Sequence, residues 1–452
     1  MKDKLSFSSY LAIGLMLFAL FFGAGNLIFP AQLGQYAGTN IVPAAFGFLV
    51  TGVGLPLLGI LAIGFSGSRD LQDLSSRVHP AYGIFFTSLL YLTIGPFFAI
   101  PRTATVGFEV GIAPMIPGAS LQWSLLLFSF LFFALVLVFS LYPTKLVDNI
   151  GKILAPALVL LLAILLITAF VNPMGVIQAP EEGYTSGAFM KGFIEGYNTM
   201  DALASLVFAI IVINIVKSYG VTSKGEILRA TAKTGVIAIV ILGALYVGIA
   251  YLGATSTGVL GLFDTGGPVL SGAASHYFGN LGLVLLAVAI ILACLTTGIG
   301  LITACGEYFH KLLPQLGYKT WVVIFTTFSF VIANFGLANI ITFSIPVLMF
   351  LYPLAIVIML LAFLSPLFNH ARMVYVATTI VTLLISIVDG LKALCDSLEI
   401  AYFGWLDSIL TFYGQVLPLY NQGLGWLAPA LIVIVITGIV ARIQKAFSVQ
   451  EA

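Results

Sequence analysis

Residues 21–30 read FFGAGNLIFP and close an apolar run of about 20 residues, long enough to cross a bilayer as one helix. The stretch nevertheless carries Gly23, Gly25, Asn26 and Pro30, and glycine and proline both weaken a helix interior. Irregular backbone at membrane depth is tolerated only where it is buried in protein or lines a cavity. We therefore expect a broken membrane helix with bare amides, and Pro30 marking the break. The alternative is that the G-x-G spacing only lets a neighbouring helix approach.

The composition of the 452-residue chain indicates its class. It is 60% hydrophobic and 8% charged, with a mean hydropathy of +1.13, whereas a soluble domain has about a quarter charged residues. We expect a polytopic protein of the lipid bilayer, whose first apolar run is retained and not cleaved as a signal peptide. The net charge of +1, with no Lys/Arg stripe, argues against a nucleic-acid partner. Cys294, Cys305 and Cys395 are too scattered for a disulfide framework or a metal site.

Polar and turn-forming borders divide the chain into apolar spans. We expect twelve membrane helices, at about 8–33, 41–65, 81–104, 121–142, 150–171, 187–216, 227–253, 281–309, 319–337, 340–364, 373–391 and 426–444. The amphipathic segment 392–425 could hold a re-entrant or interfacial helix.

The placement of basic residues predicts the orientation. With the N-terminus inside, all but three of the eighteen lysines and arginines fall on the cytoplasmic side, the exceptions being Arg102, Lys191 and Lys392. This positive-inside bias predicts a multi-pass protein of the cell membrane with both termini cytoplasmic. The loops are too short for a soluble domain and no G-x-x-x-x-G-K-[ST] motif is present, so gradients and not nucleotides are expected to drive any work.

A second irregular stretch occurs in the sixth span, MKGFIEGYNTMDALASLVFAIIVINIVK, residues 190–217. Glu195, Asn198, Thr199 and Asp201 lie close together there, and an ionisable residue at membrane depth marks a functional site. The alternative is that the stretch up to Thr199 is an external loop and that Asp201 caps the helix.

Breaks in the first and the sixth spans are typical of an inverted-repeat secondary transporter. The predicted repeats are about 8–171 and 187–364, followed by two helices at about 373–444, in a single transporter domain. The substrate is expected between the two breaks at mid-membrane. An amino acid suits such a site, because bare amides bind a carboxylate and bare carbonyls bind an ammonium group.

Four stretches carry a family resemblance: GAGNLIFP, YLTIGPFFAIPRTATVGFE, GYNTMDALASLVFA and LTTGIGLITACGEYF, in the first, third, sixth and eighth spans. They resemble the BrnQ-type branched-chain amino acid:cation symporters over nearly the whole chain. That family is placed in the amino acid, polyamine and organocation superfamily, whose LeuT-type fold has two inverted five-helix repeats. The resemblance implies an all-α membrane fold and leucine, isoleucine and valine as substrates.

The resemblance also implies a cation site. In sodium-coupled relatives of this fold, the eighth helix supplies two hydroxyls and a carbonyl, and the first helix supplies two carbonyls. Carried over, the ligands are the carbonyls of Ala19, Phe22 and Ala293 and the hydroxyls of Thr296 and Thr297. Five neutral oxygens suit a monovalent cation, with Na⁺ as the first choice. A threonine in a membrane helix more commonly back-bonds to its own helix or bonds to a neighbouring one.

A proton is the alternative coupling ion, through Glu195 or Asp201. Some proton-coupled relatives place a lysine of the fifth helix at the cation position. The one candidate here, Lys152, lies close to the cytoplasmic end of its span, where the positive-inside bias already accounts for it.

The substrate site is expected to combine the breaks with helix three. Its predicted residues are Gly23, Ala24, Gly25, Asn26, Asn198, Thr199, Asp201, Tyr91, Gly95 and Phe208, with Ile94, Phe98, Leu203 and Leu206 as further apolar lining. An apolar pocket separates neighbours differing by one methylene by only about 1 to 3 kcal/mol, so overlapping specificity is expected. Arg102 and Glu109, seven residues apart, are expected to form either a gate pair or an interfacial salt bridge.

Other functional classes fit less well. A channel would show a repeated carbonyl-filter sequence or a ring-forming charge motif, and a receptor would carry a signalling domain. An intramembrane enzyme would need paired ionisable groups such as H-E-x-x-H, which the sequence lacks. We therefore expect no enzymatic activity, no cofactor and no metal beyond the transported cation, and the oligomeric state stays open.

Overall fold

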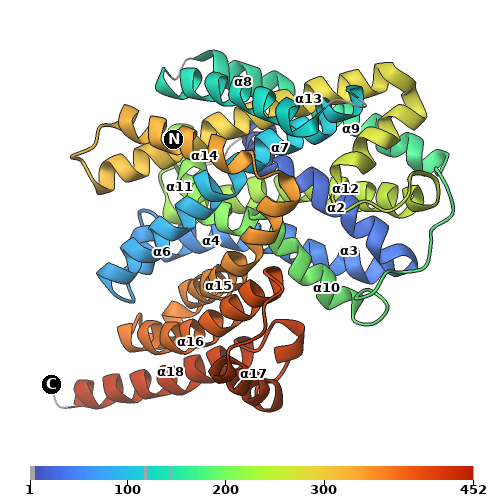
Figure 1. The fold of residues 1–452 in the computed structure, drawn as a ribbon. Coiled ribbons are helices and arrows are strands. Elements are labelled where there is room, and N and C mark those ends of the chain that lie inside the picture. Colours follow the sequence, from blue (N-terminus) through green and yellow to red (C-terminus); the bar gives the residue numbers. More distant parts are fainter. Residues whose placement is uncertain (1–5, 117–119, 143–144, 451–452) are drawn as a thin grey trace.

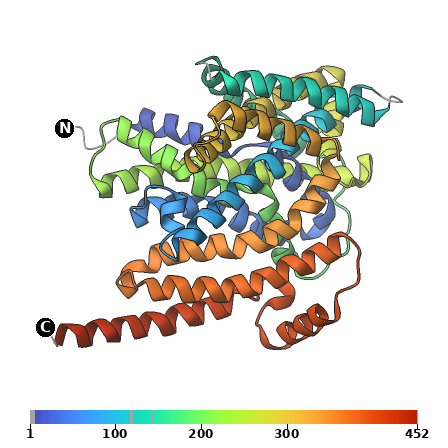
Figure 2. The same ribbon diagram turned by 60° about the vertical axis from the view of Figure 1, so that its left-hand side comes forward.

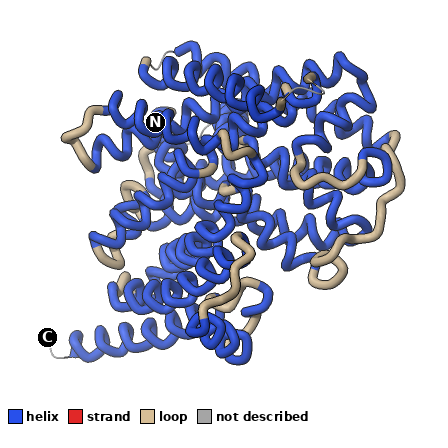
Figure 3. Tube along the Cα trace, viewed as in Figure 1, coloured by secondary structure: helices blue, strands red, loops and turns tan. Residues whose placement is uncertain are grey.

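The computed structural model describes residues 6–116, 120–142 and 145–450, and this part of the chain is built from helices without any strand (Figure 3). Nine helical segments in it are long and apolar enough to cross a membrane, and three shorter apolar helices accompany them. Helices satisfy their own backbone hydrogen bonds, which is what a lipid environment demands. The expectation of an all-helical polytopic membrane protein is confirmed.

The first span is broken as predicted. Helix α1 (Phe7–Phe21) and helix α2 (Ala24–Ala37) are separated by Phe22 and Gly23 in extended conformations, and the Gly23 N–H donates to Asn26 Oδ1 at 2.9 Å. Pro30, predicted to mark the break, lies inside α2, so that assignment is wrong. Because proline has no N–H, the carbonyl of Asn26, one turn before Pro30, lacks its helical donor. Helix α2 continues without that hydrogen bond.

The sixth span is also broken. It consists of α10 (Ala188–Glu195), a 3₁₀ turn η5 (Gly196–Thr199), Met200 in a left-handed conformation (φ 63°) and α11 (Asp201–Ser218). The alternative is wrong in that the stretch before Asp201 is largely helical and Asp201 is not the cap, but the helix does begin at Asp201 as that alternative expects. Asp201 is the first residue of α11, and its side chain is used elsewhere.

The other helices are α3 (Ile41–Leu49), α4 (Leu55–Ser66), α5 (Leu71–Ser75), α6 (Pro80–Leu92), α7 (Ala99–Gly111), α8 (Leu121–Leu141), α9 (Lys145–Val171), α12 (Lys224–Leu260), α13 (Gly267–Leu312), α14 (Tyr318–Ala333), α15 (Leu337–Leu364), α16 (Arg372–Ser397), α17 (Gly404–Val416) and α18 (Leu427–Gln450). Most of them coincide with the predicted spans, several with longer ends, whereas α5 and α17 lie outside those spans. Short π turns at 50–54 and 93–97 join α3 to α4 and α6 to α7. The segment 392–425 does contain a helix, α17.

Two groups of helices are visible in Figures 1 and 2. Helices α16 and α18 lie along one side of the bundle, with α16 packed against α15 and α17 beside them. The core group places α2 against α12, α4 against α11 and α7 against α13. The start of α1 and the end of α18 lie toward the same side in Figure 2.

Two faces of the bundle are distinguished below. The basic face carries Arg69, Lys217, Lys224 and Lys311, at the ends of α4, α11 and α13 and the start of α12. The opposite face carries the segment 261–266, which joins α12 to α13. The first part of α13, as far as Gly279 (φ 61°), bends away from the predicted eighth span. The predicted eighth span, 281–309, therefore corresponds to the part of α13 that follows Gly279.

Glycines let α2 and α12 pack backbone against backbone. A Cβ at Gly34 of α2 would overlap the Ala250 carbonyl of α12, and a Cβ at Gly253 of α12 would overlap the Ala31 carbonyl of α2. Small residues at helix crossings are what membrane packing selects, because lipid supplies no hydrophobic force between helices. This reciprocal contact holds α2 against α12 on the face opposite the basic face.

Replacing Gly253 tests that contact. We expect Gly253→Ala to lower the melting temperature in detergent, because an extra methyl in a close-packed crossing costs about 1–3 kcal/mol. Gly225→Ala is the matched control on the same helix, since a Cβ there meets no atom within 4 Å. Fluorescence-detected thermal unfolding compares the two, and equal melting of both variants and the wild type would contradict the packing described.

Candidate functional site

The two chain breaks meet through three buried side chains. Asn26 Nδ2 donates to Asp201 Oδ2 at 2.6 Å and also to the Tyr246 hydroxyl, and that hydroxyl donates to Asp201 Oδ2 at 2.8 Å. Asn26 is 2% exposed and Asp201 3%. These three residues, called the junction below, join α2, α11 and α12. Tyr246 was not predicted, because a single tyrosine in an apolar span carries no signal.

A small cavity lies beside the junction. Its volume is about 50 Å³, enough for a few water molecules but far below the roughly 300 Å³ at which ligand pockets begin. Its lining comes from both breaks and from helices α7 and α13. The lining residues are Leu20, Phe21, Gly23, Ala24, Gly25, Asn26, Ile94, Ala99, Arg102, Thr103, Thr199, Met200, Asp201, Ala204, Phe208, Thr297 and Leu301. The structure therefore brings most of the predicted substrate residues together.

Three predicted residues lie elsewhere. Tyr91 stacks on Tyr308 with ring centroids 4.2 Å apart, and both line a second, larger cavity. Gly95 lies in the π turn, where a Cβ would clash with Cys305 Sγ. The Asn198 amide turns away to Glu195 Oε2 at 3.0 Å. Of the further predicted lining, Phe98, Leu203 and Leu206 are buried outside the cavity.

Arg102 lines the cavity, and its predicted pairing with Glu109 is wrong. Its Nη1 donates to the Asn198 carbonyl at 2.7 Å, whereas Glu109 accepts a hydrogen bond from Thr265 at 2.8 Å. Seven residues rise about 10.5 Å along a helix, so the two side chains point to one side but do not meet. The sequence signal for Arg102 was its charge at membrane depth.

Two backbone oxygens of the first break are left without helical partners. The N–H of Gly23 goes to the Asn26 side chain and the N–H of Asn26 goes to the Gly23 carbonyl at 3.2 Å. The carbonyls of Ala19 and Phe22 therefore lose the donors that a continuous helix would supply, and no other bond to them occurs among the described residues. Both carbonyls are available to a ligand.

The eighth-span threonines lie next to this break. A Cβ on Gly23 would stand 3.6 Å from the methyl group of Thr297, and Thr297 lines the cavity. The Thr296 hydroxyl donates to the Ala293 carbonyl at 2.9 Å, which leaves the lone pairs of that hydroxyl free. In the described part of the chain, no three His, Cys, Asp or Glu side chains converge as metal ligands would.

A larger cavity of about 680 Å³, the vestibule, opens on the basic face between α4, α6, α11 and α13. Its rim side chains are mostly exposed, 87% for Arg69 and 82% for Lys311. On α11 the vestibule reaches Val207, next to Phe208 of the small cavity, and on α13 it reaches Ala304, one turn from Leu301. The vestibule therefore ends within one helical turn of the small cavity.

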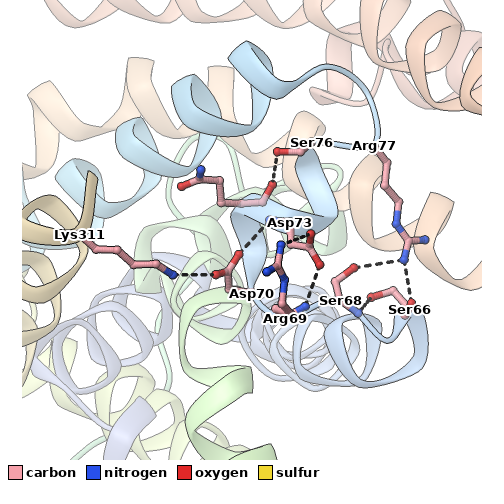
Figure 4. A network of polar contacts seen from close by, with 9 residues as sticks. Ser66, Ser68, Arg69, Asp70, Asp73, Ser76, Arg77 and Lys311 are labelled. Carbon is pink, nitrogen blue, oxygen red and sulfur yellow. Dashed lines mark hydrogen bonds and ion pairs between the residues drawn. The ribbon is translucent and has the colours of Figure 1, made fainter. Parts of the chain in front are cut away.

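Figure 4 shows how the vestibule rim is held. Lys311 of α13 pairs with Asp70 at 3.7 Å, and Arg77 donates to the Ser66 carbonyl at 2.7 Å. The backbone N–H of Arg69 donates to Asp73, and this bond lowers the pKa of the Asp73 carboxyl. These contacts fix the turn between α4 and α6 beside the end of α13.

The opposite face is closed over the cavity. Gln35 of α2 donates to the Gly261 carbonyl at 2.9 Å and accepts from the Phe263 N–H at 3.1 Å. A Cβ at Gly266 would overlap the Ile28 carbonyl, so the segment 261–266 lies directly on α2. This face is therefore closed by packed segments, whereas the basic face opens into the vestibule.

Comparisons with known proteins agree with this architecture. A family model described as branched-chain amino acid transport protein matches residues 6–444. The branched-chain amino acid permease BraB of Bacillus subtilis (strain 168) is 50% identical over 432 residues, covering 96% of this chain and 95% of the relative. The permease BrnQ of Escherichia coli (strain K12) is 40% identical over 436 residues, covering 96% of both.

Solved structures share the fold at low sequence identity. The inward-facing conformation of Mhp1 matches with a TM-score of 0.62 and 12% identity over 97% of this chain and 91% of that one. A manganese transporter of Eremococcus coleocola matches with a TM-score of 0.57 and 13% identity, over 96% and 94%. These matches confirm the expected LeuT-type fold. The chain belongs to the family of branched-chain amino acid transport proteins, which are transporters and not enzymes.

Proposed function

We propose that the protein imports leucine, isoleucine and valine together with a monovalent cation, by alternating access. The observation that carries this proposal is a central cavity between two broken helices that is approached by a vestibule on one face and closed on the other. The relatives named above are branched-chain amino acid permeases. The positive-inside bias supports assigning the basic face to the cytoplasm. With that assignment both termini are inside and the structure is inward-facing.

The cavity offers matching groups to an amino acid. The N–H groups of Ala24 and Gly25 begin α2 and have no partner among the described residues, so they can donate to a carboxylate. The Asp201 carboxyl can accept from an ammonium group. Ile94, Phe208 and Leu301 supply apolar surface for the side chain.

Substrate binding must enlarge the cavity. Its present volume of about 50 Å³ does not accommodate an amino acid, but at most about one helical turn separates it from the vestibule. Movement of α1, α11 or α13 on the side of the basic face would join the two spaces. The glycine-packed contact of α2 with α12 would stay fixed meanwhile.

Sodium is the coupling ion that the backbone geometry favours. The free carbonyls of Ala19 and Phe22 lie in the segment that reaches Thr297, and the Thr296 hydroxyl lies on the Ala293 carbonyl. These are the neutral oxygens that suit a monovalent cation. One charge crossing 100 mV supplies about 2.3 kcal/mol, which supports accumulation of the substrate against its gradient.

A proton is the second candidate, and Asp201 is the residue that would carry it. Asp201 is buried at the cavity, whereas Glu195 is partly exposed and pairs with Lys191 at 3.2 Å. Lys152 lies in the second turn of α9, and its side chain is outside the described residues. The two repeats would span about 8–171 and 187–364, with α16 and α18 outside them.

Blocking the first break tests the substrate site. We expect Gly25→Leu to weaken leucine binding at least tenfold, about 1.4 kcal/mol, because a Cβ there already stands 3.3 Å from the Phe29 ring and 3.5 Å from Arg102 Nη1. Scintillation-proximity binding on the purified protein measures the loss. Gly300→Leu is the matched control, since a Cβ at Gly300 meets nothing within 4 Å. Undiminished binding by Gly25→Leu would reduce the break to a packing device.

Removing the hydroxyls tests the cation site. Thr296→Ala and Thr297→Ala should each raise the half-saturating sodium concentration several-fold, with a smaller effect on leucine affinity at saturating sodium, because coupling between the two ligands is reciprocal. Thr342→Ala is the control, since Thr342 makes the same kind of back-bond on the exposed side of α15. Leucine uptake into proteoliposomes with separately imposed gradients is the measurement.

The same assay identifies the coupling ion. Wild-type uptake that ignores sodium and follows the proton gradient would contradict the sodium proposal. In that case Asp201→Asn should make exchange of labelled for unlabelled leucine independent of pH while net uptake is lost.

A further inference from the structure

Arg102 is a buried cation without an anionic partner. Its side chain is 2% exposed, and its two recorded hydrogen bonds go from Nη1 to the Asn198 carbonyl at 2.7 Å and from Nη2 to Ser344 Oγ at 3.3 Å. Its Nε has no partner, and no carboxylate in the described part of the chain lies within ion-pair distance of it. An isolated buried charge is strongly unfavourable unless it is paired.

The surroundings of Arg102 add positive potential. The N-terminus of α2 lies beside it, because a Cβ on Gly25 would stand 3.5 Å from Nη1, and the amides of Ala24 and Gly25 there are bare among the described residues. The Phe29 ring, 4.9 Å from Cζ, covers one side of the guanidinium. The guanidinium and the two amides therefore line the cavity together, and no anionic group among the described residues accepts from them.

The same cavity is lined by one acidic side chain, that of Asp201. Its carboxyl receives hydrogen bonds from Asn26 and Tyr246 and forms no ion pair with a cation of the described residues. The cavity thus presents one basic side chain and one acidic side chain, each missing its counter-charge. These two charges are complementary to the carboxylate and the ammonium group of an α-amino acid.

We infer that Arg102 binds the α-carboxylate of the transported amino acid, together with the amides of Ala24 and Gly25, while Asp201 receives the α-ammonium group. The inference rests on the proposed function, because it concerns the same cavity and substrate class. The planar guanidinium can donate to both carboxylate oxygens, which makes the site selective for free amino acids over compounds without a carboxylate. Recognition of the head group then comes from side-chain charges as well as from the backbone.

The test compares leucine with leucinol, in which a neutral CH₂OH group replaces the carboxylate. The affinity of each compound is measured by displacement of labelled leucine from the purified protein. Where labelled leucine binds too weakly, the increase in the melting temperature of the protein with each compound replaces that measurement. We expect the wild type to prefer leucine by about 10- to 100-fold, the range that a hydrogen bond to a charged group provides. Arg102→Gln should lose most of that preference, through weaker binding of leucine and little change for leucinol.

Two variants serve as controls. Arg102→Lys keeps a charge but not the planar fork, so it should retain part of the preference, and it tests the inference if Arg102→Gln does not fold. Arg229→Gln removes an arginine that is mostly exposed and pairs with Glu226 at the helix surface, so its preference should equal that of the wild type.

Several outcomes would overturn the inference. Equal losses for leucine and leucinol in Arg102→Gln would assign Arg102 to structure alone, and unchanged leucine binding would remove it from the site. Wild-type binding of leucine that requires chloride at constant ionic strength, with the same preference in Arg102→Gln, would make chloride the partner of Arg102. A wild type that binds no leucine would instead refute the proposed function.

Discussion

A hydrogen-bonded junction between two interrupted helices is the constraint on which the rest of the structure depends. Asn26, Asp201 and Tyr246 satisfy one another where the first and sixth spans lose their helical geometry. Unpaired polar groups at membrane depth cost several kcal/mol each. Because the Asn26 side chain accepts from the Gly23 N–H, and the Asn26 backbone N–H donates to the Gly23 carbonyl, the carbonyls of Ala19 and Phe22 stay free. One asparagine therefore ties the substrate cavity to the candidate cation site.

The packing around the junction differs between the two faces of the bundle. Toward the opposite face, glycines bring α2 into backbone contact with α12 and with the segment 261–266, so that little space is left. Toward the basic face, α4, α6, α11 and α13 diverge around the vestibule, whose rim is held by an exposed ion pair of Asp70 with Lys311. Exposed ion pairs contribute at most about 1 kcal/mol, so this rim can rearrange more easily than the glycine-packed side.

Much of the fold could be predicted because its signals are local. Apolar spans are set by bilayer thickness, and the breaks appear as glycine and polar residues within them. The predicted role of Pro30 at the break is wrong, because the sequence does not show that α2 has already begun at Ala24. Tyr246 and the closure at Gly266 depend on contacts between distant segments, which no local pattern carries. Arg102 was recognised as unusual, but the helical rise shows that Glu109 could not be its partner.

Photolabelling measures directly whether the substrate binds between the two broken helices. Photo-leucine carries a diazirine on its side chain, so irradiation of the reconstituted protein marks the residues that surround that side chain. The account predicts adducts on Ile94, Phe208 or Leu301, which line the small cavity, and their disappearance when unlabelled leucine is in excess. Adducts that unlabelled leucine suppresses but that occur only on vestibule residues, such as Tyr308 or Ile211, would contradict binding between the broken helices.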